Sequence, residues 1–344
     1  MTPWDPLNND DHGEQQRLRR DVIHYLNPTV MVSDLKEDVR PKIVEKICAA
    51  IALGKNLVLV RGAYRIGKST ATQMALQKLA MDDGRYTTRT LTLADFGRND
   101  PDDPVKDSPE TVMAKFRSAI LNRDPSKRLV VRIDNVMDVF EEHPDVIPLF
   151  WKTISSLKDI TFLMDFHYNA QHEADYFQSC PEPSTVWIGP LNREETGNYL
   201  ARLSNKCGFG VSQESAAAVF AATGGRPYEI RILLQQFVVL TREAAMPIQN
   251  LSPGLVDGVT DVMMTGSGVF TKYFRFFHEH LSEDQRRALK TIADSPGGIP
   301  SSTETEKFSE IFVPVGWVDR GQETRQLTIR GKILRKLIQG SLSV

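Results

Sequence analysis

The sequence predicts an α/β fold: a parallel sheet with helices on both faces, then a helical region, then a C-terminal segment of helices and a hairpin. Three observations lead to this prediction. Short apolar runs alternate with helical patterns up to about residue 190, as in parallel sheets. From Asn192 onward the pattern is helical, without intervening strands. After residue 265, two helical stretches precede two short strand-like stretches around a polar tip.

The composition of the 344-residue chain is that of a globular protein of about two domains. Hydrophobic residues make up 41% and charged residues 25%, which excludes an intrinsically disordered chain and a membrane bundle. No apolar stretch approaches the ~18 residues that cross a bilayer, and no signal-peptide pattern begins the chain. Three widely spaced cysteines suit a reducing compartment, so we expect a cytoplasmic protein without a membrane partner. The net charge of −2 leaves nucleic-acid binding open.

The alternating region begins with a helical pattern that ends at Gly54, a residue type common at helix C-termini. Residues 56–60 then form a continuous apolar run, which is typical of a strand buried on both faces. Further strands are predicted at residues 86–93, 128–133, 160–164 and 185–188. Helices are predicted at residues 14–26, 39–53, 69–80, 109–121 and 145–157.

The rest of the chain is predicted to be mainly helical, with a break around Pro247 to Gly258. Ser282 is the expected N-cap of its helix, because Glu283 and Asp284 follow in the first turn. The predicted helices are residues 193–207, 212–222, 228–243, 282–294, 303–312 and 331–339. Two short strands, at residues 317–318 and 325–329, flank a polar tip. Two helices followed by a hairpin are the outline of a winged helix.

A phosphate-binding pattern, GxxxxGK[ST], lies between the first buried strand and a helix, which is the context that this motif requires. Glycines let backbone N–H groups surround a phosphate, and the helix N-terminus adds partial positive charge. Lys68 is expected to contact the β- and γ-phosphates of ATP, and the Ser69 hydroxyl to bind Mg²⁺. The predicted nucleotide-binding residues are Gly62, Ala63, Tyr64, Arg65, Ile66, Gly67, Lys68, Ser69 and Thr70. The alternative is an ordinary glycine turn.

A second acidic element is expected at the end of a neighbouring strand, and Asp134 fits this position. Its carboxylate would hold Mg²⁺ through water, with a helix-capping role as the alternative. Asn135 follows at a position where many ATPases with such a phosphate loop carry a catalytic acid, and an amide cannot act as a base. Hydrolysis is therefore expected to be slow, unless Glu141 or Glu142, which also fit plain surface charges, supplies the base. The predicted catalytic residues are Lys68, Asp134 and Asn135.

Polar residues after the fourth predicted strand offer two further candidates. Asp165 and Asn169 could sense the γ-phosphate, with loop solvation as an equal alternative. His167 and His172 suggest a metal pair, but their spacing does not place them on one helical face. No third ligand is near them in the sequence, so we expect a structural or solvated role for both histidines.

Three segments resemble the AAA+/STAND group of P-loop ATPases, especially the archaeal-type ATPases. Residues 61–69 are similar to the group's RGxRRxGKT/S loop, residues 223–228 to its GGxPY segment, and residues 189–196 to the start of its helical lid. The resemblance covers roughly residues 30–245, and a C-terminal winged helix is usual in the group. With the element pattern, it divides the chain into an N-terminal extension (1–28), an ATPase core (29–190), a helical lid (191–260) and a winged-helix domain (261–344).

The resemblance also implies cofactors and site residues. ATP or ADP with Mg²⁺ would bind, and Pro227 would lie near the base and sugar, although a proline there also fits a simple helix start. Arg226 or Arg231 would act as a second sensor of the phosphates. Residues 30–32 would lie near the adenine. Asn135 departs from the group's pattern, no arginine finger can be placed, and the long C-terminal repeats of signalling members are missing.

The C-terminal charges leave the partner open between duplex DNA and protein. Basic residues gather at the end of the chain, namely Arg320, Arg325, Arg330, Lys332, Arg335 and Lys336. Arg320 and Arg325, at the hairpin tip, are expected to track a phosphate backbone or enter a minor groove. The helix over residues 303–312 is acidic, and DNA would repel it.

We therefore expect an ATP-binding oligomeric switch on DNA, of the transposition, replication or defence type. The alternative is a signalling ATPase that binds protein partners and holds ADP, without contacting DNA. A third hypothesis is a binding protein with a degenerate pocket, which conflicts with the intact Lys68, Ser69 and Asp134.

Overall fold

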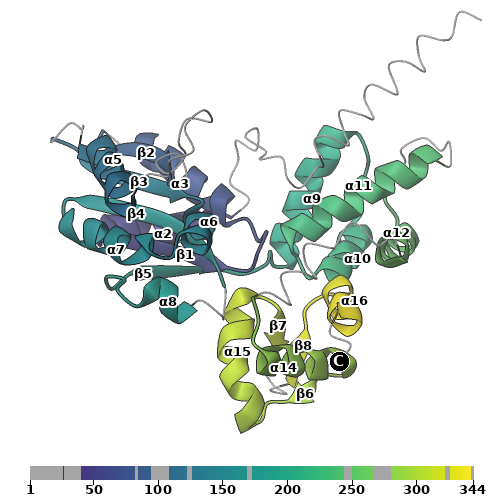
Figure 1. The fold of residues 1–344 in the computed structure, drawn as a ribbon. Coiled ribbons are helices and arrows are strands. Elements are labelled where there is room, and N and C mark those ends of the chain that lie inside the picture. The colour runs from purple at the N-terminus through teal and green to yellow at the C-terminus, as the bar shows by residue number, and fades with distance from the viewer. Residues whose placement is uncertain are drawn as a thin grey trace, which may run out of the picture.

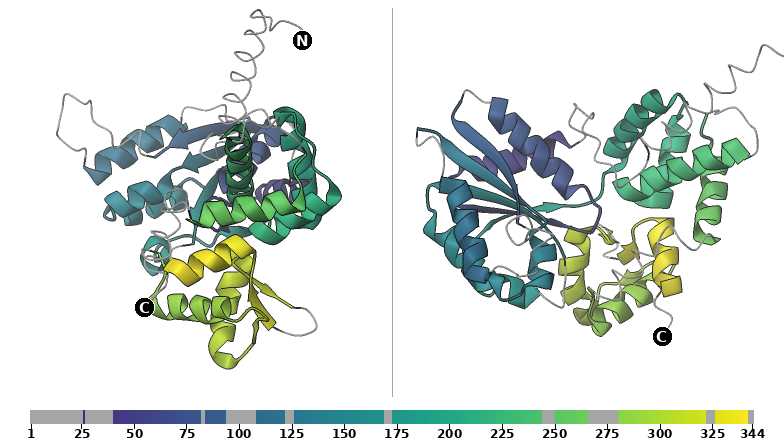
Figure 2. Two further views of the ribbon diagram at one scale, coloured as in Figure 1. Left: turned by 90° about the vertical axis from the view of Figure 1, so that its right-hand side faces the viewer. Right: turned by 45° about the horizontal axis from the view of Figure 1, so that its top comes forward.

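The computed structural model describes residues 26, 40–81, 84–93, 108–121, 126–168, 173–243, 250–265, 280–321 and 326–341. They form a sheet domain, a helical lid (193–265) and a C-terminal domain (280–341), which Figures 1 and 2 show from several sides. Of the helix expected over residues 14–26, only Leu26 is described, and residues 30–32 lie outside the description. Among the described residues, no helix is long and apolar enough to cross a membrane.

The sheet domain contains the predicted parallel sheet. Its strands are β1 (Leu57–Gly62), β2 (Tyr86–Thr92), β3 (Arg128–Asp134), β4 (Ile160–His167) and β5 (Ser184–Ile188). Their order is β2-β3-β4-β1-β5, and every neighbouring pair is parallel. Because all strands run the same way, the phosphate loop after β1 and the polar residues that end β3 and β4 share one edge of the sheet.

Helices cover both faces of this sheet, as predicted. One face carries Val58, Val60 and Leu163 and packs against α2 (Pro41–Ala52) and α3 (Lys68–Met81). The other face carries Leu59 and Phe162 and packs against α5 (Pro109–Leu121) and α7 (Val146–Ser156). Two short helices were not predicted from the sequence: α6 (Val136–Glu142) and α8 (Glu173–Phe177).

The lid consists of α9 (Arg193–Cys207), α10 (Gln213–Thr223), α11 (Pro227–Glu243) and α12 (Pro253–Thr265). Asn192 and Glu195 form a capping box that starts α9. The break predicted to extend to Gly258 is wrong from residue 253 onward, because α12 begins at Pro253 and continues past the expected domain boundary at residue 260. Proline suits the first position of a helix, where its missing N–H has no intrahelical partner, so here it marks a start.

The C-terminal domain contains α14 (Glu283–Asp294), β6 (Ile299–Pro300), α15 (Thr303–Val315), β7 (Val318–Arg320), β8 (Gln326–Ile329) and α16 (Lys332–Ser341). Its three strands form an antiparallel sheet in the order β6-β8-β7. Ser282 is the N-cap of α14, as predicted, and Gln285 completes a capping box with it. Strand β6 was not predicted.

The C-terminal domain packs against both other parts, as Figures 1 and 2 show. Towards the sheet domain, the Gln285 side chain donates a buried hydrogen bond to the Tyr168 hydroxyl at 2.9 Å. Towards the lid, Lys332 and Lys336 of α16 reach Asp257 and Asp261 of α12 at 3.2 and 2.8 Å. A single buried apolar cluster includes side chains from all three parts.

Candidate nucleotide-binding site

The phosphate loop joins β1 to α3, and its backbone conformation explains two of its glycines. Gly67 has φ of +95°, a left-handed conformation that glycine adopts at little cost. A Cβ at Gly62 would lie 2.3 Å from the carbonyl oxygen of Ile188, because β5 passes close to this point. The loop therefore has the tight path that lets consecutive N–H groups face one phosphate.

Lys68 begins α3, and its ammonium group lies over the loop. Its Nζ donates hydrogen bonds to the carbonyl oxygen of Ala63 at 2.7 Å and to that of Gly62 at 3.5 Å. Burial lowers the pKa of Lys68 to about 8; Asp165 nearby raises it, and Arg65 lowers it. The side chain thus lies in the loop with its charge held by backbone dipoles.

Ser69 and two carboxylates meet around a buried arginine. The Ser69 hydroxyl donates to Asp165 Oδ2 at 2.7 Å. Arg132 Nη2 lies 2.8 Å from Asp134 Oδ1 and 3.6 Å from Asp165 Oδ1, and its Nε donates to Thr72 of α3. The parallel register places the ends of β3 and β4 side by side, with Ile133 opposite Met164. The structure thus connects the predicted Ser69 and Asp134 through Asp165 and Arg132.

From the sequence, Asp165 was a candidate phosphate sensor or a solvated loop residue, and Arg132 was not a candidate. The signal for Arg132 was a charged residue within an otherwise apolar strand, two positions before Asp134 and so on the same face. Only 2% of the Arg132 side chain is exposed, and a buried guanidinium needs acceptors on several sides. Asp134, Asp165 and Thr72 supply them.

Asn135 occupies a left-handed conformation, with φ 54° and ψ 34°, at the N-cap of α6. Asparagine tolerates this conformation better than most residues, so the backbone here favours the residue type present. Glu141 and Glu142 are both exposed, and Glu141 also lies beside two histidines.

The start of α11 approaches the phosphate loop from the lid. The Arg65 guanidinium lies 5.0 Å from the ring centre of Tyr64 and 5.8 Å from that of Tyr228. Pro227, which precedes Tyr228, is the first residue of α11. Arg65 therefore contacts both Tyr64 in the phosphate loop and Tyr228 in α11. This brings Pro227, the neighbour of Tyr228, towards the loop.

Arg226, one of two candidates for the second sensor, points into the lid. Its Nε and Nη2 donate to the two carboxylate oxygens of Glu229 at 2.6 and 3.0 Å. The two residues are 1% and 0% exposed. Arg231, the other candidate, is also buried and lies near Cys207. The second-sensor role of either arginine stays a prediction.

Glu141, His167 and His280 form a cluster that the sequence did not reveal. Their potential ligand atoms all lie within 4.8 Å of one another. Burial, then the nearby charges of Lys68 and His280, lower the pKa of His167 to about 3. No third ligand lies near His167 in the sequence, but in the fold α6 supplies Glu141 and the C-terminal domain supplies His280 as potential ligands. His172 and Asn169 lie outside the described residues.

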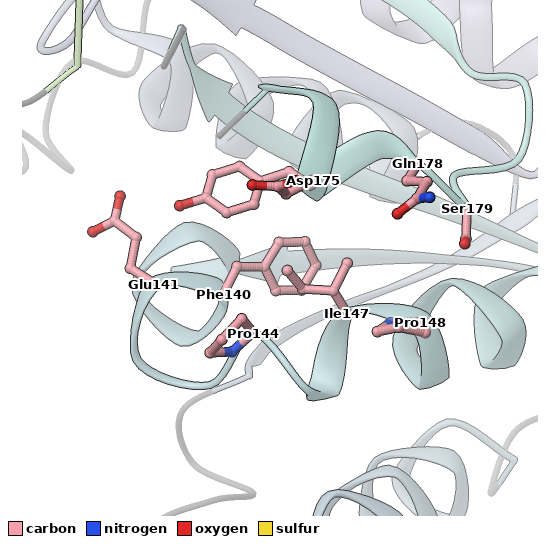
Figure 3. A pocket seen from close by; sticks show the side chains of 9 residues that line it. Phe140, Glu141, Pro144, Ile147, Pro148, Asp175, Gln178 and Ser179 are labelled. Carbon is pink, nitrogen blue, oxygen red and sulfur yellow. The ribbon is translucent and has the colours of Figure 1, made fainter. Parts of the chain in front are cut away.

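Glu141 stands at one end of a groove between α6, α7 and α8, shown in Figure 3. The floor of the groove is mainly apolar, with Phe140 and Ile147, and Asp175 and Gln178 stand at its rim. In Figure 3 the Glu141 carboxylate points away from Phe140 and Ile147.

The described basic residues that gather at the end of the chain, among them Arg320, which was predicted to contact DNA, have partners within the chain. Arg320 bonds Glu306 at 2.6 Å, Arg330 lies 3.5 Å from Asp319, and Arg335 donates to a backbone oxygen of residue 296 at 3.4 Å. Lys332 and Lys336 bond the lid, as described above. Arg325 lies outside the described residues.

The structure of the chain is similar to solved structures of other proteins. No protein-family model and no curated protein matches the sequence. A Walker-type ATPase of Pyrococcus abyssi is similar in structure, with a TM-score of 0.52 and 12% identity over 89% of this chain and 95% of the other. The ORC2 protein of Aeropyrum pernix, in ADPNP and ADP complexes, has a TM-score of 0.52 and 10% identity over 94% and 97%. Drosophila ORC bound to DNA has a TM-score of 0.51 and 14% identity over 95% and 92%. The chain therefore has the fold of the AAA+ P-loop ATPases.

Proposed function

We propose that this protein is a Mg²⁺-dependent ATPase that acts as a nucleotide-dependent oligomeric switch on DNA. One observation carries the ATPase part: the loop with Lys68 and Ser69 lies beside Asp134 and Asp165, two carboxylates from adjacent parallel strands. This is the set of groups that positions a nucleoside triphosphate and its metal ion in P-loop enzymes.

The residues present fit a magnesium ion. A hydroxyl and carboxylates are hard oxygen ligands of the kind that Mg²⁺ prefers, with water completing its shell. Ser69 and Asp134 would hold the ion, which would neutralise phosphate charge. Asp165 accepts a hydrogen bond from the Ser69 hydroxyl and so orients the hydroxyl oxygen. Arg132 partly offsets the two negative charges, so the carboxylates can lie close together without a bound cation.

Lys68 would exchange the carbonyl oxygens of the loop for phosphate oxygens. In the phosphate contacts both donor and acceptor would be charged, so they would gain a Coulomb attraction between full charges that the carbonyl contacts lack. Pro227 and Tyr228, at the start of α11, would close over the nucleotide from the lid side. Asn135 supplies no base, so we propose slow turnover as the basis of a switch rather than a motor.

Calorimetry with ATP and Mg²⁺ tests nucleotide binding. We expect Lys68→Ala to weaken binding about ten-fold or more, since it removes a charged contact to phosphate. Lys78→Ala is the matched control, because Lys78 lies in the same helix with an exposed side chain. Equal affinities for the two variants would overturn the assignment.

The DNA part rests on the fold shared with ORC bound to DNA and on a C-terminal domain that we interpret as a winged helix. One observation favours the alternative, a signalling ATPase that binds protein partners and holds ADP. The described basic residues of α16 and the hairpin are engaged within the chain, so a single copy offers DNA few unpaired charges. An ATP-driven homo-oligomer would compensate by aligning several such domains.

Light scattering after size-exclusion chromatography, with and without ATP and duplex DNA, separates the two functions. Assembly that requires ATP and retains DNA supports the switch on DNA. A monomer that retains ADP and does not bind DNA supports the signalling alternative.

A further inference from the structure

We infer that Glu141, His167 and His280 form a binding site for a divalent transition metal, with Zn²⁺ as the best fit, that joins the sheet domain to the C-terminal domain. Their ligand atoms lie within 4.8 Å of one another, and the three residues come from α6, the end of β4 and the start of the C-terminal domain. The site is separate from the Mg²⁺ residues and goes beyond the proposed ATPase function.

The ligand set selects the class of metal. Two imidazole nitrogens and one carboxylate oxygen suit zinc and neighbouring first-row metals, whereas Mg²⁺ and Ca²⁺ prefer all-oxygen sites. Ligand atoms about 2.0–2.1 Å from a tetrahedral zinc lie about 3.4 Å from one another. Glu141 is exposed, so its side chain has room to change rotamer when a metal binds.

The histidines are held in place by contacts that do not involve a metal. The His167 ring lies edge-on to Tyr64 at 5.8 Å and to His280 at 5.2 Å. The next residue, Tyr168, accepts the buried hydrogen bond from Gln285, five residues after His280. The two chain segments that carry the histidines are therefore fixed to one another, which lowers the entropic cost of assembling the site.

A metal here would couple the position of the C-terminal domain to the nucleotide site. His167 follows Asp165 by two residues on β4, and Asp165 bonds the Ser69 hydroxyl. His280 lies three residues before Glu283, the first residue of α14. Binding would thus stabilise the packed arrangement of the two domains.

Zinc titration of the metal-stripped full chain tests the site, with a chromophoric chelator as competitor. We expect one Zn²⁺ per chain, bound at least ten-fold more weakly by Glu141→Gln and by His280→Ala. Glu142→Gln and His143→Ala are the matched controls, since both lie beside Glu141 in the chain, and we expect parental affinity for them. Glu141→Gln changes an exposed side chain, so its result does not depend on the folding of the C-terminal domain.

Cobalt substitution supplies a second readout. Co²⁺ bound by the parent should show the visible bands of a four-coordinate site, and His280→Ala should remove them. The proposal is overturned if the parent binds no Zn²⁺, or if Glu141→Gln and Glu142→Gln bind it equally. Neither readout involves ATP, so failure here leaves the ATPase proposal untouched.

Discussion

Replacing Arg226 with alanine should destabilise the lid severely. Arg226 and Glu229 form a two-pronged ion pair, at 2.6 and 3.0 Å, in which both residues are almost fully buried. Removing the guanidinium leaves a buried carboxylate without its counter-charge, which costs about 3–5 kcal/mol. The matched control is Arg287→Ala, which breaks an Arg–Glu pair on α14 whose side chains are 67% and 78% exposed. Exposed ion pairs between residues four positions apart in a helix contribute about 0.3–0.5 kcal/mol to stability.

Urea unfolding followed by circular dichroism measures both losses. With a slope of about 3 kcal/mol per M, the Arg226→Ala midpoint should fall by about 1–1.7 M, and the Arg287→Ala midpoint by about 0.2 M or less. Similar losses for the two variants, or a loss below about 1 kcal/mol for Arg226→Ala, would refute the assigned burial energy.

The pH dependence of Arg226→Ala supplies a sharper test. Burial raises the pKa of Glu229, and Arg226 opposes this effect. Without Arg226, the Glu229 carboxyl group keeps its proton in the native state. In the unfolded chain the same group loses the proton above its ordinary pKa of 4.5. Because the native state then binds more protons, stability rises as the pH falls from 7 towards 4.5, and the loss relative to the parent shrinks. A loss that grows at lower pH would contradict this mechanism.

The same variant also tests whether Arg226 senses phosphate. If its role is structural, ATP affinity should survive at temperatures where the variant is folded. Weakened ATP binding in a variant of undiminished stability would instead support the sensor role implied by the resemblance to P-loop ATPases.

Three further outcomes are expected. Since the pKa of Lys68 is about 8 and phosphate binding needs the charged form, ATP affinity should fall about ten-fold between pH 7 and pH 9, and a flat calorimetric profile would contradict this. Asn135→Glu should raise the rate of phosphate release, whereas Asn135→Gly, which suits the left-handed backbone, should not; a parent faster than about 1 s⁻¹ would show that another carboxylate is the base. A single copy should bind duplex DNA with a salt slope of about −2 to −4. The double variant Arg320→Ala with Arg325→Ala should bind DNA more weakly than the parent, by the same factor on unrelated sequences. Glu306→Gln, which releases Arg320, should strengthen that binding, and fluorescence anisotropy that shows the opposite would remove the hairpin from the DNA interface.

Local patterns in the sequence were sufficient for the core of the fold. Continuous apolar runs marked the strands because a parallel sheet is buried on both faces, and the motif ending in Lys68 and Ser69 marked the phosphate loop. Ser282 marked the start of α14, since capping involves residues only three positions apart. In each case the pattern that carries the information lies within a short stretch of chain.

Short or weakly patterned helices escaped prediction for the opposite reason. α6 follows directly from Asn135, and its buried side chains contact strands and helices that are distant in sequence. α12 contains Pro253, Gly254 and Gly258, which predict a break. Its Val256 and Val259 are buried in the apolar cluster shared with α10 and α11, and this packing outweighs the weak helix propensity of the glycines.

Only the tertiary structure decided which charged and polar side chains contact one another. The sequence by itself determined which groups were available, but not which of them meet. Parallel register brings Asp165 to Ser69, and packing of the C-terminal domain brings His280 to His167. Lys332 illustrates the limit: in the sequence it is a free basic residue, whereas in the fold it bonds an aspartate of α12. The physical reason is that Coulomb and hydrogen-bond energies depend on distances in space, which chain folding sets independently of distance along the sequence.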